Sequence, residues 1–301
     1  MSVYNGAAAL PRTLQSVLTQ AGCTFEVIVV DDGSTDDSGR ILDDWAARDA
    51  RLRVIHQPNT GLTRALIRGC AEARGEFIVR QDCGDVSLPG RLAAQQALLR
   101  ENPAVVMVAC GTRFLGPEGE VLYEVVREGT RLGEGLSVLE LNQIKGPPHH
   151  GGTMFRRDTY LAVGGYRPQF VVAQDIDLWL RLSECGQCLG QTEILYVASV
   201  EAGSISGRRR DEQFKLAGLA LACARARRSG GGDQTLLDAF ESRPVSRARK
   251  GPATGAERAR FFYFLGASLR HRDRSAARRY FWHAVLEQPF HLKALWRCVW
   301  G

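Results

Sequence analysis

The chain has 301 residues, of which 45% are hydrophobic and 24% charged, as in a soluble globular protein with one domain of catalytic size and a small additional region. It contains no apolar run of about eighteen residues and no signal-peptide pattern, which argues against a membrane span and predicts a cytoplasmic protein. The net charge is +6, and no P-loop, dinucleotide fingerprint or nucleic-acid motif accompanies it.

The N-terminal residues predict a strand, a helix and a second strand. Residues 1–5 fit the end of a short first strand, and residues 8–20 have apolar side chains at helical spacing. Residues 25–30, F-E-V-I-V-V, end in four consecutive apolar residues of strand-forming type and predict a buried strand. Two acids, a glycine and a Ser/Thr pair follow in residues 31–36, which favours a turn facing a phosphate or a base. Thr35 and Asp36 are better interpreted as the N-cap of a helix over residues 37–48.

A second strand-forming run, Phe77–Arg80, ends in a loop with two carboxylates, Asp82 and Asp85. Ligands of open α/β sheets bind at the carboxyl edge of the strands. Carboxylates at that edge repel a phosphorylated ligand unless a divalent cation lies between them. The loop therefore predicts a metal–diphosphate site.

The residues after this loop predict a helix and then a hairpin. Ser87 is a favoured N-cap and Pro89 fits a first helical turn, so a helix is expected over residues 89–101. A strand-forming run follows at residues 104–110, and Gly-Pro-Glu-Gly separates two apolar stretches within residues 114–124. The hairpin predicts that the sheet leaves its parallel half here.

Two further motifs contain residues that suit a site. His149 and His150 are adjacent before a predicted strand, and neighbouring strand side chains point to opposite faces, so they form a poor metal pair. Asp175 and Asp177 open a helix with apolar residues on one face. The helix dipole favours the ionised carboxylate of Asp175, which suits a proton acceptor, although simple capping explains the same residue.

Eight cysteines are scattered along the chain, and only Cys185 and Cys188 have C-x-x-C spacing. No second pair and no histidine cluster completes a four-ligand zinc site. Free thiols, as in a reducing cytoplasm, are therefore expected.

The C-terminal region differs from the rest in pattern and charge. Residues 207–228 predict a connecting helix, 229–255 a linker rich in Gly, Pro and Arg, and 256–301 three short helices similar to a tetratricopeptide hairpin. Residues 207–301 contain 20 Lys/Arg and 8 Asp/Glu, so the remainder has an excess of 6 negative charges. The basic region suits an anionic partner, such as a lipid-linked acceptor or the inner face of a membrane, or is a solvated arginine-rich surface.

Taken together, the motifs resemble those of the family 2 glycosyltransferases. The matching segments are V-D-D-G-S-T-D, G-E-F-I-x-R before D-x-x-D and S-L-P-x-R-L-x-x-Q, H-x-x-x-M-F-R-R and D-x-D-L-W. The resemblance covers about residues 2–206. It implies an α/β protein of GT-A fold over residues 1–206, with a Rossmann-like mixed sheet flanked by helices, and a small all-helical C-terminal extension.

The resemblance also implies a role for each candidate residue. Tyr4, unless it is a core aromatic, and Asp32 would hold the base, and Asp175 would be the catalytic base. The other implied roles are ribose and diphosphate binding by Asp82, a Mg²⁺ or Mn²⁺ ion at Asp82 and Asp85, and a donor-pocket or structural position for His150. The chain departs from the family at Gly84, where a metal-binding carboxylate is usual, at Ile67, where an asparagine is usual, and after Tyr196, where an arginine is missing.

The implied activity is inverting transfer of a sugar from a nucleotide-diphosphate sugar, UDP-linked by this resemblance, to a hydroxyl of a glycan or lipid-linked acceptor in cell-surface polysaccharide synthesis. The departures from the family leave a degenerate, non-catalytic binding or scaffold protein as the alternative. A nucleotidyltransferase fits less well, because no glycine-rich loop with a basic residue lies near the N-terminus.

Overall fold

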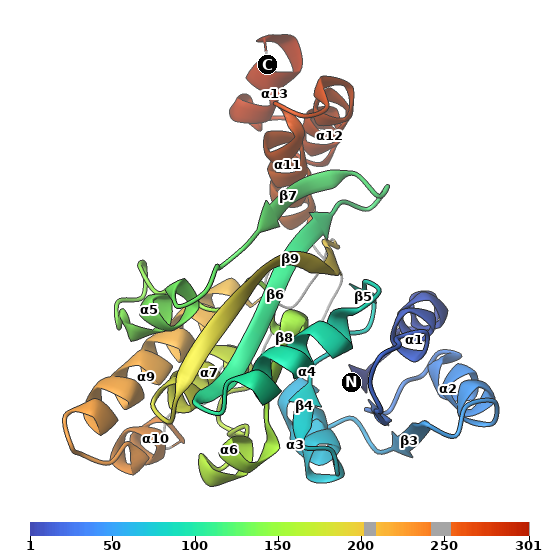
Figure 1. The fold of residues 1–301 in the computed structure, drawn as a ribbon. Helices are drawn as coiled ribbons and strands as arrows, with labels where there is room; N and C mark the ends of the chain where they lie inside the picture. The colour runs from blue at the N-terminus through green and yellow to red at the C-terminus, as the bar shows by residue number, and fades with distance from the viewer. Residues whose placement is uncertain (202–208, 242–253, 301) are drawn as a thin grey trace. The chain divides into compact units, whose positions relative to one another are not determined.

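The computed structural model describes residues 1–201, 209–241 and 254–300 (Figure 1). The chain forms two compact units, each assembled from separate stretches of sequence. The first unit comprises Met1–Thr112, Val125–Ala198 and Phe214–Pro244. The second comprises Arg113–Glu124, Ser199–Gln213 and Val245–Gly301. The hairpin segment thus groups with the C-terminal helices, unlike in the predicted division near residue 206.

The N-terminal part of the first unit is a parallel sheet. It contains β1 (Ser2–Val3), β2 (Val27–Asp31) and β3 (Leu52–His56), paired in that order. All five residues of β2 are buried, as its uninterrupted apolar run predicts. The connecting helices α1 (Leu10–Leu18) and α2 (Ser38–Ala46) supply Leu14 and Leu42 to the same apolar core.

A second sheet contains the remaining strands in the order β4-β8-β6-β9-β5, with β7 paired to β6. Their bounds are β4 (Phe77–Val79), β5 (Val86–Ser87), β6 (Val105–Leu115), β7 (Val121–Val125), β8 (Thr153–Arg156) and β9 (Gln187–Ser199). β8 runs antiparallel to both β4 and β6. The predicted departure from a parallel sheet is confirmed, and the predicted hairpin corresponds to β6 and β7.

Helices pack around this sheet in the first unit. They are α3 (Leu62–Ala71), α4 (Arg91–Glu101), α5 (Arg131–Ser137), α6 (Arg157–Ala162), α7 (Gln174–Ser183), α9 (Arg210–Arg228) and α10 (Gln234–Glu241). Leu178 of α7 joins Phe155 of β8 and Ile78 of β4 in the central core. The core therefore anchors the helix that presents Asp175.

Two local expectations differ from the structure. Helix α4 begins at Arg91 after Gly90, whose φ of +80° favours glycine as the N-cap, whereas Ser87 lies in β5 and pairs with Tyr196. The predicted linker 229–255 contains α10. The Leu237 side chain of this helix is buried against apolar residues of α9. The polar residues on both sides of α10 are typical of a linker, so the sequence did not indicate this helix.

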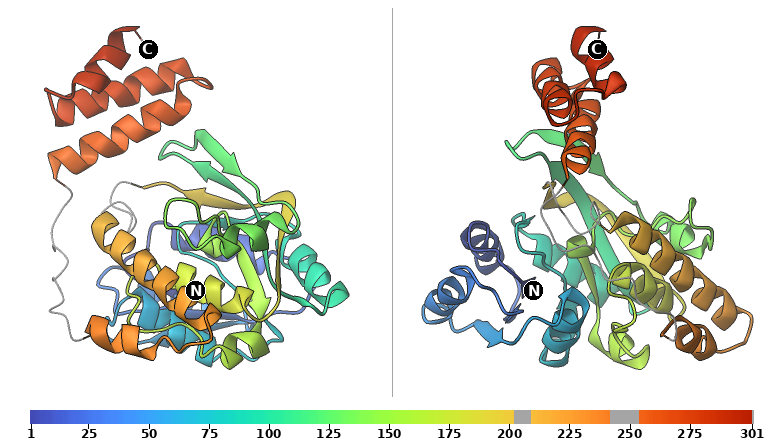
Figure 2. Two further views of the ribbon diagram at one scale, coloured as in Figure 1. Left: turned by 90° about the vertical axis from the view of Figure 1, so that its left-hand side faces the viewer. Right: turned by 180° about the vertical axis from the view of Figure 1, so that it is seen from behind.

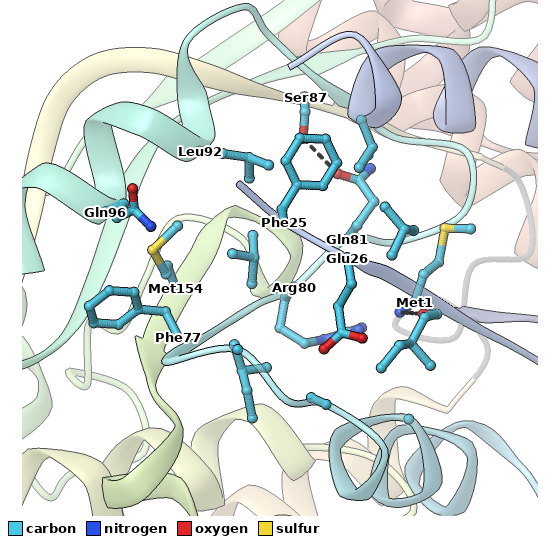
Figure 3. A pocket seen from close by; sticks show the side chains of 18 of the residues that line it. Met1, Phe25, Glu26, Phe77, Arg80, Gln81, Ser87, Leu92, Gln96 and Met154 are labelled. Atoms are coloured by element: carbon cyan, nitrogen blue, oxygen red, sulfur yellow. Dashed lines mark hydrogen bonds between the residues drawn. The ribbon is translucent and has the colours of Figure 1, made fainter. Parts of the chain in front are cut away.

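A cavity of about 240 Å³ lies between β2 and β4 (Figure 3). Its lining includes Phe25, Phe77 and Met154, and the Met1 ammonium donates to the Ile28 carbonyl at 2.8 Å. Burial and the charge of Arg80 lower the pKa of that ammonium to about 5. Neither carboxylate of the acidic loop lines this mainly apolar cavity, so it is not the predicted diphosphate site.

The second unit is built from the end of the β6–β7 hairpin and the C-terminal helices α11 (Gly255–Leu269), α12 (Arg274–Glu287) and α13 (Leu292–Trp300). Figure 2 shows α11 and α12 side by side. Leu122 of the hairpin packs with Leu265 and Phe281. A capping box between Thr254 and Glu257 starts α11. The predicted C-terminal helices are confirmed.

Two sequence-based expectations concern cysteines and membrane spans. All eight cysteines are free, which confirms the predicted thiols, and burial raises the pKa of Cys188 to about 12. Within the described ranges, neither Cys185 nor Cys188 belongs to a group suited to a metal ion. No helix among the described residues is long and apolar enough to cross a membrane.

Candidate active site

The loop between β4 and β5 fixes both acidic side chains through buried polar partners. Arg80 donates to the Asp82 carboxylate, and the Tyr196 hydroxyl donates to Asp85 at 2.9 Å. The same hydroxyl accepts from the Asp82 backbone N–H at 3.1 Å. Burial raises the pKa of Asp82, but Arg80 and the adjacent His149 and His150 outweigh it and lower that pKa to about 2. Asp82 is therefore a carboxylate at neutral pH.

His149 lies beside the two carboxylates. Its Nδ1 atom is 3.6 Å from Asp85 and 4.0 Å from Asp82, and its ring stacks on Tyr196. Burial lowers the pKa of His149, which favours the neutral imidazole, and its Nδ1 atom accepts a hydrogen bond from the Gly151 N–H at 3.1 Å. Ligand atoms of Asp82, Asp85 and His149 all lie within 4.8 Å of one another. Two carboxylates and an imidazole form a donor set that fits a divalent cation such as Mn²⁺.

Gly84 explains why the loop lacks a third carboxylate. Its φ of +99° lies in the left-handed region, where a side chain is disfavoured. An aspartate at this position would strain the loop as it is folded here. His149, which sequence reasoning did not select, provides the third potential ligand instead.

His150 begins a short 3-10 helix, His150–Gly152, instead of a strand, and its ring contacts Tyr166 and Arg80. It is buried, with Nε2 2.6 Å from the Tyr166 hydroxyl and 3.3 Å from Nε of Arg80. Burial and the charge of Arg80 lower the pKa of His150 to about 3. The neutral ring therefore holds Arg80 beneath the acidic loop, and a contact with the donor stays a prediction.

Asp175 lies in the first turn of α7, as predicted, and accepts a hydrogen bond from the Ile176 N–H at 2.9 Å. Burial raises the pKa of Asp175 to about 6, and the negative charge of Asp82 adds to the increase. Asp177, by contrast, is buried and paired with Arg167 and Arg181, which makes it structural.

Asp32 and Tyr4 occupy contrasting positions near the ends of β2 and β1. Asp32 is 2% exposed and accepts from the Thr60 N–H at 2.9 Å and the Gly61 N–H at 2.8 Å. It thereby fixes the loop that precedes α3. Tyr4 is 55% exposed, which excludes a core position and leaves its ring accessible to a ligand.

The loop after β1 connects the Asp32 and Asp82 regions. Asn5 accepts from the Thr35 N–H at 2.7 Å, and its own N–H donates to Ser34 at 3.0 Å. On the other side, Thr13 of α1 accepts from the Gly84 N–H at 3.0 Å. The loop after β1 therefore contacts the turn that follows Asp32 and, through α1, the acidic loop, whereas a common site for Asp32, Asp82 and Asp175 stays a prediction.

Arg91 is a buried cation that sequence reasoning also missed. It is 0% exposed and donates to the Ser87 hydroxyl at 2.8 Å and the Arg80 carbonyl at 2.9 Å, while its guanidinium lies over the Tyr196 ring. It therefore ties the start of α4 to both ends of the acidic loop. The R-L-x-x-Q motif contains Arg91, but by itself this motif indicates a helix and not a buried cation.

Comparison with known proteins matches this fold and these motifs. The sequence model described as Glycosyl transferase family 2 matches residues 1–163. The chain is 32% identical over 193 residues to the putative glycosyltransferase EpsE of Bacillus subtilis, an alignment covering 62% of this chain and 66% of EpsE. The chain therefore spans slightly less than two thirds of that relative.

Two solved structures have a similar fold. Crystalline S. aureus TarS 1-349 in complex with UDP has a TM-score of 0.56 at 18% identity, covering 99% of this chain and 86% of that chain. The mannosyltransferase PcManGT from Pyrobaculum calidifontis, in complex with GDP-Man and Mn²⁺, has a TM-score of 0.57 at 19% identity, covering 99% and 85%. These likenesses confirm the predicted fold class.

Proposed function

The chain belongs to glycosyl transferase family 2, and we propose that it moves a sugar from a nucleotide-diphosphate donor, UDP-linked, to a hydroxyl group of a glycan or lipid-linked acceptor. We place this reaction in the cytoplasm, in cell-surface polysaccharide synthesis. The observation that supports it most is the group of Asp82, Asp85 and His149, whose ligand atoms lie within 4.8 Å of one another, with Asp175 in the first turn of α7 as the candidate base. The UDP in TarS and the GDP-Man in PcManGT support a nucleotide-linked donor.

The proposed donor site follows the loops at the carboxyl ends of β1, β2 and β4. Tyr4 would stack on the base, because its ring is exposed at the end of β1. Asp32 would contact the base through Oδ2, which accepts from Gly61 and retains a second lone pair. Asp82 would bind the ribose and diphosphate, with His150 supporting it through Arg80.

The proposed metal ligands are Asp82, Asp85 and His149, whose donor atoms already lie together. A divalent cation, Mg²⁺ or Mn²⁺, would offset negative charge on the diphosphate leaving group. Tyr196 holds Asp85 through its hydroxyl, and Arg80 holds Asp82 in its charged form. The protein therefore fixes the ligands before the ion binds.

Asp175 would accept the proton of the acceptor hydroxyl. The acceptor oxygen then forms a bond to the anomeric carbon on the face opposite the diphosphate, while the bond from that carbon to the diphosphate oxygen breaks. One such displacement inverts the anomeric centre without a covalent enzyme intermediate. Because the base must be ionised, the rate is expected to rise with pH through about 6 and then level off.

The substitution Asp175→Asn tests this assignment. Loss of a positioned general base is expected to lower kcat by roughly 10²–10⁴-fold. UDP affinity is expected to stay unchanged, because the base acts on the acceptor. Steady-state kinetics and calorimetric titration with UDP measure the two quantities. Asp158→Asn, which removes an exposed acid from the first turn of α6, is the matched control.

The outcome separates enzyme from binding protein. Retained transfer activity in Asp175→Asn would remove this residue from the role of base. UDP binding without transfer or donor hydrolysis in the unaltered chain, across a panel of nucleotide sugars, would instead establish the non-catalytic alternative.

The metal ligands are tested by direct ion binding. His149→Ala is expected to weaken Mn²⁺ binding in the presence of UDP by roughly 10–100-fold, because a ligand or its support is lost. Electron paramagnetic resonance of free Mn²⁺ measures the change, and His271→Ala, an exposed histidine of the second unit, is the control. Equal affinity in the two variants would exclude His149, and full activity in chelator would exclude a metal requirement.

A further inference from the structure

The C-terminal helices expose an unusual set of large apolar side chains. We call it the 282–296 surface; its members are Trp282 (53% exposed), Leu286 (61%), Phe290 (88%), Leu292 (73%), Leu295 (42%) and Trp296 (58%). The described residues include thirteen exposed large apolar side chains, and these six fall within one stretch of fifteen residues. Isolated exposed apolar residues are ordinary, but a contiguous group marks an interaction site.

Helical spacing places these side chains on outward faces. Trp282 and Leu286 are one turn apart on α12, and Leu292, Leu295 and Trp296 have the i, i+3, i+4 spacing of one face of α13. Phe290 lies in the connection between the two helices. The surface is therefore continuous along the chain from α12 into α13.

Among the described residues of the second unit, the apolar cores include none of these six side chains. The inward face of α12 contributes Ala277, Phe281 and Ala284, and α13 contributes Ala294 to the same side. These residues are all nearly fully buried. The 282–296 surface lies on the other faces of the same helices and is left for a partner.

The C-terminal helices that form this surface contain more cationic than anionic side chains. Residues 254–300 contain nine Lys/Arg and three Asp/Glu. Each of the three acids has a local structural partner: Glu257 in the capping box, Asp273 at the N-cap of α12, and Glu287 in a 2.7 Å pair with Arg258. Two of the nine cations form ion pairs among the described residues, Arg258 with Glu287 and Arg279 with Glu118 of the hairpin at 2.5 Å, so an excess of positive charge remains on these helices.

Two of these cations lie on α13 itself. Lys293 is exposed, and the guanidinium of Arg297 lies 5.5 Å from the ring centre of Trp296. Helix α13 thus combines tryptophan and leucine on one face with lysine and arginine beside them. This is the composition of helices that lie in the interface of a bilayer.

We propose that the 282–296 surface docks on an anionic lipid bilayer, with α13 lying along the membrane plane. The apolar side chains would enter the boundary between headgroups and acyl chains, where tryptophan is favoured. The cations would attract anionic headgroups, each adding to the affinity. A protein partner of mixed charge would bind the apolar side chains but would leave the surplus of positive charge without a counterpart, whereas an anionic bilayer matches both. The proposal does not depend on glycosyl transfer.

Vesicle co-sedimentation of the full chain tests the proposal. Vesicles of phosphatidylcholine alone are compared with vesicles containing roughly one-third phosphatidylglycerol, at low and high salt. Binding is expected on the anionic vesicles, with a decrease at high salt. The double variant Trp282→Ser/Trp296→Ser is expected to lose at least about tenfold in partitioning. Leu161→Ser, which removes an exposed leucine of α6, is expected to bind like the unaltered chain.

A second variant distinguishes loss of membrane binding from misfolding of the double serine variant. Lys293→Glu/Arg297→Glu keeps every apolar side chain of the surface and is expected to lose the preference for anionic vesicles. Circular dichroism checks that both variants retain their helices. Equal vesicle binding by all variants would overturn the proposal. So would the absence of vesicle binding together with a concentration-dependent dimer that the double serine variant abolishes, because the occupant would then be a second copy of the chain.

Discussion

The acidic loop of the first unit and the 282–296 surface of the second unit differ in the kind of side chain that is placed unfavourably. The loop has buried charged groups, and the surface has exposed apolar groups. Around the loop, charged groups such as Arg80 and Arg91 are buried, and each has several polar partners. On the 282–296 surface, large apolar groups such as Trp296 stay in solvent. Burying charge and exposing apolar area both cost free energy, so each arrangement indicates a function rather than a need of the fold.

The difference also indicates how each region meets its ligand. The loop is preorganised, because Arg91 donates to the Arg80 carbonyl, Tyr196 donates to the Asp85 carboxylate, and the Arg91 guanidinium lies over the Tyr196 ring. Fixed dipoles and charges of this kind stabilise a reacting group without reorganisation. The 282–296 surface has no such framework and needs none, since a bilayer imposes no exact geometry on the side chains that enter it.

Arg91→Met provides the largest expected effect and tests the framework. Methionine fills a similar space but leaves the Arg80 and Gly151 carbonyls without their buried donor. The free energy of unfolding is expected to fall by about 3–5 kcal/mol, measured by urea denaturation. Arg100→Met, on the exposed side of the same helix, is the control and is expected to change it by about 0.5 kcal/mol or less. A small effect at Arg91 would show that the loop is organised by other groups.

Asp175→Asn is expected to stabilise the protein while removing activity. Burial raises the pKa of Asp175 to about 6 from its usual 3.8, so the folded state disfavours the carboxylate. The free energy of unfolding of the unaltered chain therefore falls as pH rises from about 4 to about 6. Above pH 6 the neutral amide avoids this cost, and a gain of about 1–3 kcal/mol is expected.

Urea denaturation at two pH values measures this gain. The difference between Asp175→Asn and the unaltered chain is expected at neutral pH and is expected to vanish below about pH 4, where both side chains are uncharged. Asp158→Asn, at an exposed helix start, is expected to show no gain at either pH. An unchanged stability of Asp175→Asn at neutral pH would mean that the carboxylate is not disfavoured in the folded state.

The local pattern of the sequence predicted the elements that form these regions. The apolar run at residues 25–30 corresponds to β2, and the acid-led amphipathic segment after residue 173 corresponds to α7. The two carboxylates of the loop follow β4, as strand-forming residues before Asp82 indicated. Periodicity and turn chemistry act over a few residues, and they were sufficient for these features.

Partners distant in the chain were beyond such reasoning. Tyr196 reaches the loop from a position more than one hundred residues away, and His149 approaches Asp85 from the residues before β8. Arg91 lies in a helix as expected, but its buried partners, the Ser87 hydroxyl and the Gly151 carbonyl, come from segments distant in the chain or outside that helix. The exposure of Tyr4 likewise depended on the whole fold. The ligand set therefore required the structure, whereas the acidic loop did not.

The smallest expected effect concerns Trp296 and decides how the second region is understood. Because its side chain is 58% exposed, Trp296→Ser is expected to change the free energy of unfolding by about 0.5 kcal/mol or less. Phe281→Ala, on the buried face of α12, is expected to lower the free energy of unfolding by about 3–5 kcal/mol. Thermal and urea denaturation of both variants measure the two changes. A loss at Trp296 that approached the loss at Phe281 would make the tryptophan part of the core of the second unit. Its apolar area would then be explained by folding, and the contrast with the acidic loop would disappear.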